Sequence, residues 1–183
     1  LKYVDPDGRE FAYAGDAVFK VRITESLGRL RAAHPRLGAL IRRLDESVFL
    51  HTFHPNDGGG DDRVYWPRIG VPGNNGENGV GTDTAIIVGV DLPDDKLDQL
   101  LAHELSHSED GDSGTYSTAP DCKGCANVTE SKATRMGNVT PAGRRNPDTT
   151  YRGQRVNKPT QVPPEPKGEP KRRKTTTKKV GEE

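Results

Sequence analysis

The pattern of apolar residues between residues 24 and 45 predicts a helix. These residues recur at intervals of three and four positions, a spacing that places them on one face of a helix. The set comprises Leu27, Leu30, Leu37, Leu40, Ile41 and Leu44. Pro35 interrupts the series, and proline is tolerated only in the first turn of a helix because it lacks a backbone N–H. We therefore expect one kinked or broken amphipathic helix, with Thr24 as its N-cap.

Two other apolar segments predict strands. Residues 48–53 contain Val48, Phe49, Leu50 and Phe53, which indicate a short strand with His51 and His54 interleaved. Residues 85–90 are almost continuously apolar and indicate a buried strand. Residues 56–82 between them are rich in Gly, Asn and Asp around the short island Val64-Tyr65-Trp66, which predicts a hairpin with long loops.

The second predicted helix follows the buried strand. Residues 91–95 combine acidic residues with an early proline, which favours a helix start. Four leucines continue the helical spacing up to Leu105, and Gly111 provides a C-terminal stop. Beyond Asp112 the pattern indicates turns, except for residues 128–136, VTESKATRM, which could form about two helical turns.

Charge and composition divide the chain unevenly. Only 31% of the 183 residues are hydrophobic, which is too few for a core that includes the whole chain. Residues 158–183 contain eight Lys/Arg against four Asp/Glu, and their only apolar side chains, apart from five prolines, are Val162 and Val180. Residues 1–157 carry 19 basic and 23 acidic groups. We therefore predict a disordered basic tail after one modest folded domain.

Several classes of protein are excluded. No apolar run approaches the roughly 18 residues that a membrane span needs. Two cysteines are too few for a disulfide-rich scaffold. They form Cys122-Lys123-Gly124-Cys125, for which half a zinc knuckle, a redox pair and no special role all stay open. Met136 is the only methionine and no signal peptide is visible, so we expect a fragment or processed piece whose natural N-terminus lies upstream.

One motif carries chemistry. His103-Glu104-Leu105-Ser106-His107 is an HExxH sequence on the best-supported helix. Two histidines one helical turn apart can converge on one metal ion, and Glu104 is placed to take a proton from water at that ion. The alternative is a surface helix with two solvated histidines. His51 and His54, three residues apart on a strand, should point to opposite faces, so we expect ordinary edge-strand histidines there.

The surrounding sequence resembles a known family. LLAHELSHSEDGDSG resembles the active-site helix of bacterial secreted effector zinc metallopeptidases, members of the zincin superfamily. ESKATRMGN and Tyr151-Arg152 resemble, more loosely, the Glu-containing segment and the Arg/Tyr-rich ending of that family, which implies Tyr151 as a transition-state stabiliser. The opening KYVDPDGRE is similar to the junction in Rhs (YD-repeat) polymorphic toxins, where the repeat shell gives way to a variable toxin domain.

This resemblance implies a single α+β, zincin-like domain with a small twisted sheet and an active-site helix. The domain would comprise residues 17–157, after a junction segment of residues 1–16 and before the tail. It implies a zinc-dependent endopeptidase with one Zn²⁺ per chain, secreted or delivered into a target cell. Its partners would be a protein substrate, a cognate immunity protein and an upstream Rhs shell. An exposed edge strand near residues 48–53 would hold the substrate extended.

The third zinc ligand is open to several candidates. A catalytic zinc site usually takes three protein ligands. Asp112 lies five residues past His107, and Asp110, Asp121 and Cys122 are weaker candidates. Glu130 lies on the short predicted helix, a placement that resembles zincins whose third ligand is a Glu on a following helix. A helix also holds a ligand more rigidly than a Gly-Asp-Ser loop, so we favour Glu130 over Asp112.

The basic tail supports an alternative function. A run such as Lys171-Arg172-Arg173-Lys174 could contact nucleic acid, which would make the protein a toxin that acts on or binds nucleic acid. The acidic balance of residues 1–157 argues against this, and HExxH has no standard role in nuclease chemistry.

Overall fold

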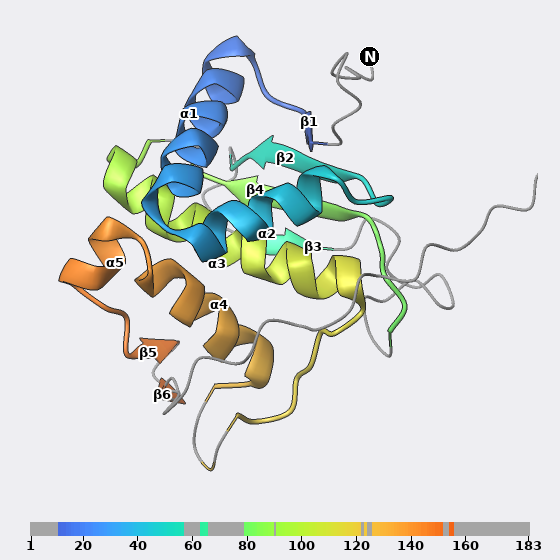
Figure 1. Cartoon of the computed structure of the whole chain (residues 1–183), viewed down its shortest axis with the longest axis vertical. Coiled ribbons are helices and arrows are strands. Elements are labelled where there is room, and N and C mark those ends of the chain that lie inside the picture. Colours follow the sequence, from blue (N-terminus) through green and yellow to red (C-terminus); the bar gives the residue numbers. More distant parts are fainter. Residues whose placement is uncertain are drawn as a thin grey trace, which may run out of the picture.

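The computed structural model describes residues 11–56, 63–65, 79–89, 91–121, 123, 126–151 and 154–155, and it combines helices and strands (Figure 1). In chain order the elements are β1 (Phe11–Tyr13), α1 (Ala17–Ala33), α2 (Pro35–Asp45), β2 (His51–Pro55), β3 (Arg63–Tyr65), β4 (Thr84–Val88), α3 (Asp94–Ser113), α4 (Val128–Asn138), α5 (Pro141–Arg145), β5 (Thr150–Tyr151) and β6 (Gln154–Arg155). This mixture is compatible with the predicted α+β class.

The main sheet has the strand order β1-β2-β4-β3. β1, β2 and β4 are parallel, and β3 pairs antiparallel with β4. Part of the apolar island in residues 56–82 forms β3, which pairs with β4. Most of that span lies outside the described residues, so the predicted hairpin stays a prediction. β1 lies within residues 1–16, the segment that the sequence assigns to a junction, and Phe11 joins the core.

The prediction of an exposed edge strand near residues 48–53 is wrong. β2 begins only at His51 and lies between β1 and β4, so its backbone is paired on both sides. The edges of the main sheet are β1 and β3. Alternation along a single strand reports which face is buried, but it does not report how many neighbours the strand has, so the sequence pattern could not identify the edges.

The predicted break at Pro35 is confirmed, but the helix before it is longer than predicted. α1 begins at Ala17, where the Asp16 carboxylate accepts a hydrogen bond from the Phe19 N–H at 2.8 Å. Asp16 and not Thr24 is therefore the N-cap. Pro35 occupies the first turn of α2, the position that tolerates proline, and His34 Nδ1 accepts from the Arg36 N–H.

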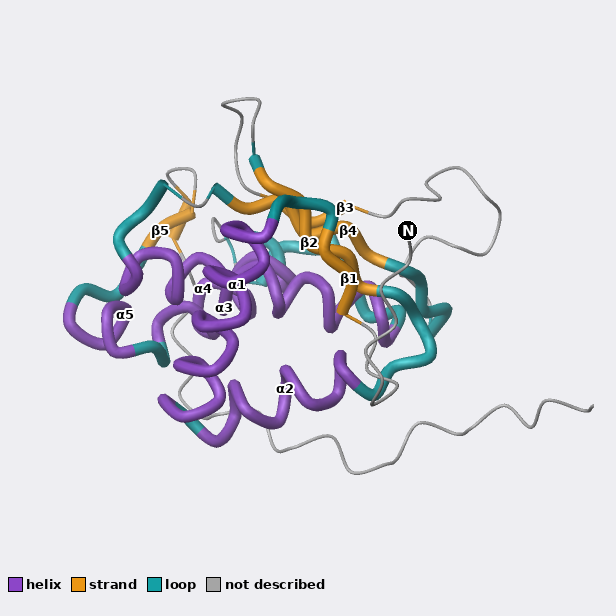
Figure 2. Tube along the Cα trace, turned by 90° about the horizontal axis from the view of Figure 1, so that it is seen from above, coloured by secondary structure: helices purple, strands orange, loops and turns teal. Residues whose placement is uncertain are grey.

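α3 lies against the sheet and also contacts α1, α2 and α4. The helices gather on one side of the sheet (Figure 2), and the core between the two layers includes Phe53 and Ile86 from the strands and Leu97, Leu101 and Leu105 from α3. The other side of α3 is covered by α4 (Figure 1). α3 thus lies between the hydrophobic core and a second interface, which it forms with α4. The two histidines of the HExxH motif lie at this second interface.

The predicted end of α3 at Gly111 is wrong. The helix continues to Ser113 and ends at Gly114, whose φ of +68° is the left-handed conformation that glycine adopts readily. A Cβ at Gly114 would also lie 2.3 Å from the backbone nitrogen of Val80, so the chain from residue 79 passes too close for a larger residue. Gly111 is buried inside the last turn, where its carbonyl accepts from the Thr82 N–H.

Candidate metal centre

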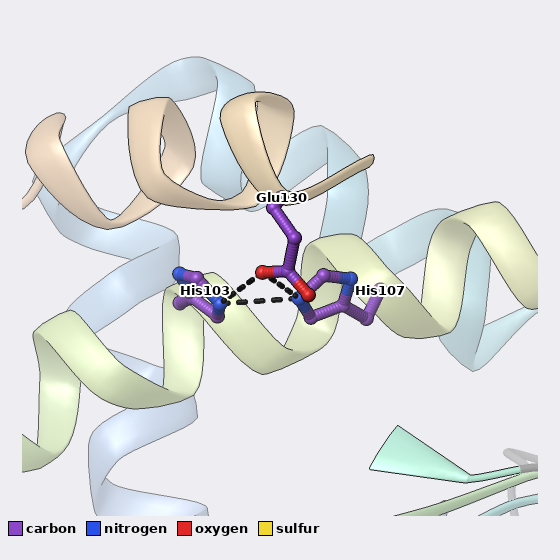
Figure 3. A group of neighbouring side chains, drawn as sticks. All are labelled: His103, His107 and Glu130. Carbon is purple, nitrogen blue, oxygen red and sulfur yellow. Dashed lines mark hydrogen bonds and ion pairs between the residues drawn. The ribbon is translucent and has the colours of Figure 1, made fainter. Parts of the chain in front are cut away.

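α3 positions both histidines of the HExxH motif on the face that α4 covers. Leu101 and Leu105 point into the core, whereas His103 and His107 lie one turn apart toward α4 (Figure 3). The side chains of His103 and His107 retain 17% and 10% of their accessible surface. The surface-helix alternative with solvated histidines is therefore wrong, because both rings are largely enclosed.

α4 brings Glu130 to the same point. The predicted short helix is confirmed and runs from Val128 to Asn138. Asn127 caps it by accepting a hydrogen bond from the Glu130 N–H at 2.7 Å, so Glu130 lies in the first turn. An Asn three residues before a Glu is a capping signal in the sequence that marks the start of this helix.

A glycine allows the two helices to approach closely. A Cβ at Gly137 would lie 3.0 Å from the backbone oxygen of Gln99 and 3.8 Å from the Cβ of His103. Any larger residue would have to displace α4 from α3 at the level of the first histidine. The distance between Glu130 and the histidines thus depends on a contact made almost two turns further along α4.

The three side chains converge on a small volume (Figure 3). His103 Nε2 and His107 Nε2 are 3.1 Å apart. Glu130 Oε2 lies 3.6 Å from the former and 3.3 Å from the latter. The two contacts of Glu130 are longer than the charge-assisted hydrogen bonds of about 2.8 Å that a carboxylate and an imidazolium form directly. Direct hydrogen bonding alone therefore does not account for the spacing.

The spacing fits three ligands of one metal ion. For zinc, ligand distances of about 2.0–2.2 Å in a tetrahedron place neighbouring ligand atoms about 3.3 Å apart. The separations of 3.1, 3.3 and 3.6 Å bracket that value. Two imidazoles and one carboxylate also form the donor set that zinc accepts in catalytic sites, and a fourth position would remain for water. Among the described residues, these three form the group of side chains that could hold a metal ion.

The charges in the site are strongly coupled. Burial by itself would raise the pKa of Glu130, but the polar contacts and positive charges of His103 and His107 lower it to about 2. Burial likewise lowers the pKa of His107, yet the contact with Glu130 and the negative charges of Glu104, Glu130 and Asp110 raise it above its usual value. The carboxylate is thus ionised at neutral pH, and the site favours positive charge between the helices.

Glu104 is enclosed with the histidines. It follows His103 on α3 and retains only 3% of its accessible surface. Its negative charge is one of the causes of the raised pKa of His107, which places its carboxylate in the same electrostatic environment as the triad. A buried carboxylate that acts on the charge of His107 is a candidate for proton transfer at this site.

The structure does not bring the other candidate ligands to the histidines. Asp112 accepts a hydrogen bond from Ser47 and lies 3.5 Å from His51 Nε2, on the side of α3 that faces the sheet. Asp110 pairs with Lys132 and accepts from Thr115 Oγ1 at 2.9 Å. Asp121 forms an ion pair with Arg135 at 3.1 Å. Among the candidates that the structure describes, Glu130 alone joins the histidines in the group that could hold a metal, and Cys122 lies outside the described residues.

His51 is not an ordinary edge-strand histidine. It is completely buried in the middle of the sheet, and its Nδ1 shares a hydrogen bond of 2.7 Å with Thr84 Oγ1. With Asp112 and Ser47 it forms a polar link from the sheet to the C-terminal end of α3. His51 is buried because β1 and β4 flank its strand, and the sequence pattern around His51 does not predict these neighbours.

A charged cluster next to the triad was not predicted. Lys132 Nζ lies 2.9 Å from Glu109 Oε2 and 2.5 Å from Asp110 Oδ1. Glu109 is also paired with Arg43 of α2. Burial lowers the pKa of Lys132, but Glu109 and Asp110 raise it above its usual value, so the amine is charged. Arg43, the Glu109-Asp110 pair and Lys132 come from three separate helices, and no local signal links them.

Other predicted features lie outside the described residues. They include Cys122, Cys125, residues 158–183 and, for Tyr151, the side chain; the backbone of Tyr151 belongs to β5. The role of Tyr151 therefore stays a prediction. Within the described part of the chain, none of the helices is long and apolar enough to span a membrane. Comparisons with protein-family models, with curated proteins and with solved structures find no match for this chain.

Proposed function

We propose that the protein is a zinc-dependent endopeptidase whose metal ion is held by His103, His107 and Glu130. The observation that carries the proposal is the mutual spacing of 3.1 to 3.6 Å between their three donor atoms. Three protein ligands leave a coordination position for water, as in catalytic zinc sites, whereas structural sites are closed by four. The partial exposure of the three side chains is consistent with access from solvent.

The residues around the triad fit peptide hydrolysis. A bound zinc ion would lower the pKa of water and polarise a carbonyl group. Glu104 is the residue that we assign as general base, which accepts a proton from the attacking water and donates it to the leaving amine. Its burial beside His107 keeps the carboxylate away from competing solvent. Tyr151 is the candidate that the family resemblance supplies for stabilising the transition state.

The finer fold and the biological role belong to the same proposal. An HExxH helix packed against a small sheet, with a glutamate on a following helix, supports a zincin-like domain. The resemblance of the flanking sequence to Rhs toxins supports a bacterial toxin or effector that is secreted or delivered into a target cell. Its partners would be a protein substrate there and a cognate immunity protein.

Glu104→Gln tests the proposal, because the amide keeps the size of the side chain and removes the base. We expect zinc to stay bound while peptide cleavage falls by about 10²–10⁴-fold. Glu25→Gln, at an exposed position of α1, is the matched control and should cleave like the wild type. Cleavage would be measured on a peptide library with zinc and with a chelator, and nucleic acid would be offered in parallel.

Two results would contradict the proposal. Undiminished peptide cleavage by Glu104→Gln would show that Glu104 is not the general base. Cleavage that survives the chelator would show that the reaction needs no metal ion. Degradation of the nucleic acid in place of the peptides would favour the alternative function.

A further inference from the structure

The cluster of Lys132, Glu109, Asp110 and Arg43 joins three helices beside the metal centre. Lys132 comes from α4, the two carboxylates from the C-terminal half of α3 and Arg43 from α2. Two positive and two negative groups therefore balance one another. Asp110 is only 3% exposed and the Glu109 side chain 16%, whereas Lys132 and Arg43 reach solvent, so the two carboxylates are the enclosed members of the cluster.

Such a cluster is sensitive to the loss of any member. Charges taken out of water are tolerated when each is paired, and removal of one partner leaves the other as an uncompensated buried charge. Loss of the Lys132 amine would leave Asp110 with the hydroxyl of Thr115 as a neutral partner in place of a charged one. The ion pairs that attract α4 to α3 would then be lost, and the carboxylates of α3 would repel one another or be solvated by water.

The position of Lys132 connects this cluster to the metal centre. Lys132 is two residues beyond Glu130, and Glu109 and Asp110 are two and three residues beyond His107. The ion pairs therefore tie together the same turns of the two helices that carry ligands. The first turn of a helix lacks part of its intrahelical hydrogen bonding, so its placement depends on its cap and on tertiary contacts.

We propose that Lys132 is a positioning residue of the metal centre, which holds the first turn of α4 against α3 so that Glu130 reaches His103 and His107. The cap at Asn127 orients this turn, and Gly137 sets the separation further along the helix. The Lys132 pairs act between these two points, where the third ligand lies. This inference rests on the proposed function, because it assumes that Glu130 is a zinc ligand.

The test is the zinc affinity of the full chain, measured by competition with a chromophoric chelator. Lys132→Met keeps most of the aliphatic stem and removes the charge, and we expect it to weaken zinc binding by about 10–100-fold, the usual cost of losing a residue that orients a ligand. Lys132→Arg should restore most of the affinity. Arg135→Met is the matched control, since it removes from the same helix an ion pair whose partner, Asp121, lies outside α3.

A second background separates positioning from general stability. In Glu130→Ala, the ligand that Lys132 positions is absent, so adding Lys132→Met should change zinc affinity less than about twofold. A general weakening of the fold would lower the affinity by the same factor in both backgrounds. Equal losses, or an unchanged affinity of Lys132→Met in the wild-type background, would overturn the inference.

Two further measurements keep the test decisive. If Lys132→Met does not fold by circular dichroism, Glu109→Gln replaces it as a milder break of the same cluster, with the same dependence on Glu130 expected. His103→Ala is measured alongside as a probe of the site itself. Zinc affinity that is indifferent to His103→Ala would refute the proposed function, whereas affinity that responds to His103→Ala but not to Lys132 would refute only the positioning role.

Discussion

Helices α3 and α4 both contribute to the candidate metal centre, but different interactions hold them in the fold. α3 lies between the sheet, α1, α2 and α4, and its leucines are part of the hydrophobic core. α4 packs mainly against α3 and the short α5, and its first turn is placed by a cap and a charged cluster. The histidine pair therefore lies on a helix that several leucines anchor in the core, whereas α4 joins the core through Met136 and its first turn, which carries Glu130, is placed by polar contacts.

The fold therefore does not fix the positions of all three candidate ligands equally firmly. The backbone spacing of His103 and His107 is fixed by one helical turn of α3 and does not depend on the position of α4. The distance from either histidine to Glu130 can change whenever α4 moves. A metal ion bound by all three would link the two helices, so its binding would stabilise mainly the weaker attachment.

The largest expected effect is on zinc binding itself. His103→Ala should lower zinc affinity by several orders of magnitude, because it breaks the pair that α3 holds ready. Glu130→Ala should cost less than His103→Ala, since both imidazoles remain in place. Asp112→Ala, measured with the same chelator competition, should bind zinc like the wild type, because Asp112 contacts Ser47 and His51 instead. Normal binding by Glu130→Ala with loss in Asp112→Ala would reverse the ligand assignment.

The next effect concerns the stability of α3. Leu101→Ala removes a completely buried side chain and should lower the free energy of unfolding by about 2–5 kcal/mol in urea titrations. Leu100→Ala, at the half-buried neighbouring position, is the control and should cost clearly less. A similar cost at both positions would show that α3 is not anchored by the core as we describe.

The pH dependence of zinc binding tests the electrostatic coupling between His107 of α3 and Glu130 of α4. A histidine must lose its proton before it binds zinc, and the pKa of His107 is raised above its usual value. Affinity should therefore fall as pH decreases, starting above the ordinary histidine value of about 6.5, by about tenfold per pH unit for each histidine that titrates. In Glu130→Ala one cause of the raised pKa is gone, so the fall should begin at lower pH. Identical pH profiles would contradict the coupling.

Without metal, the same pair should affect stability in a defined pH window. The pKa of Glu130 is depressed to about 2, so its stabilising contribution is present above the ordinary value of 4.5 and is lost as pH falls toward 2. The pKa of His107 is raised, so its contribution is present below its ordinary value and is lost as pH rises through the raised pKa. Thermal unfolding of the metal-free protein against pH measures both limits.

The smallest effect is expected at the helix crossing. Gly137→Ala would place a Cβ 3.0 Å from the Gln99 oxygen, so α4 should shift by a few tenths of an ångström and zinc affinity should fall a few-fold. Gly28→Ala is the matched control, because no atom lies within 4 Å of a Cβ there. It should stabilise α1 by about 0.5–1 kcal/mol without changing zinc binding. Equal zinc affinity in both variants would show that the crossing distance does not control the third ligand.

Properties that are local to one element agree with the sequence-based predictions. The break at Pro35, the strand before α3, the helix after Asn127 and the facing of His103 and His107 all follow from intervals within one segment. One error was local, because Asp16 and not Thr24 caps α1. The other errors concern contacts between segments. β2 is central because β1 and β4 flank it, and α3 passes Gly111 because the chain at residues 79–82 packs along its last turns.

The sequence by itself determined the histidine pair and its glutamate neighbour, because 3.6 residues per turn place residues 103 and 107 on one face of any helix that contains them. It favoured Glu130 as the third ligand over Asp112, Asp110, Asp121 and Cys122, but it contained no distance between Glu130 and the histidines. Only the tertiary structure decided that distance, because it results from the packing of α4 against α3, with Gly137 at the crossing and Lys132 paired with two carboxylates of α3. Distances between elements result from packing and charge pairing over the whole chain, and no interval along the sequence contains them.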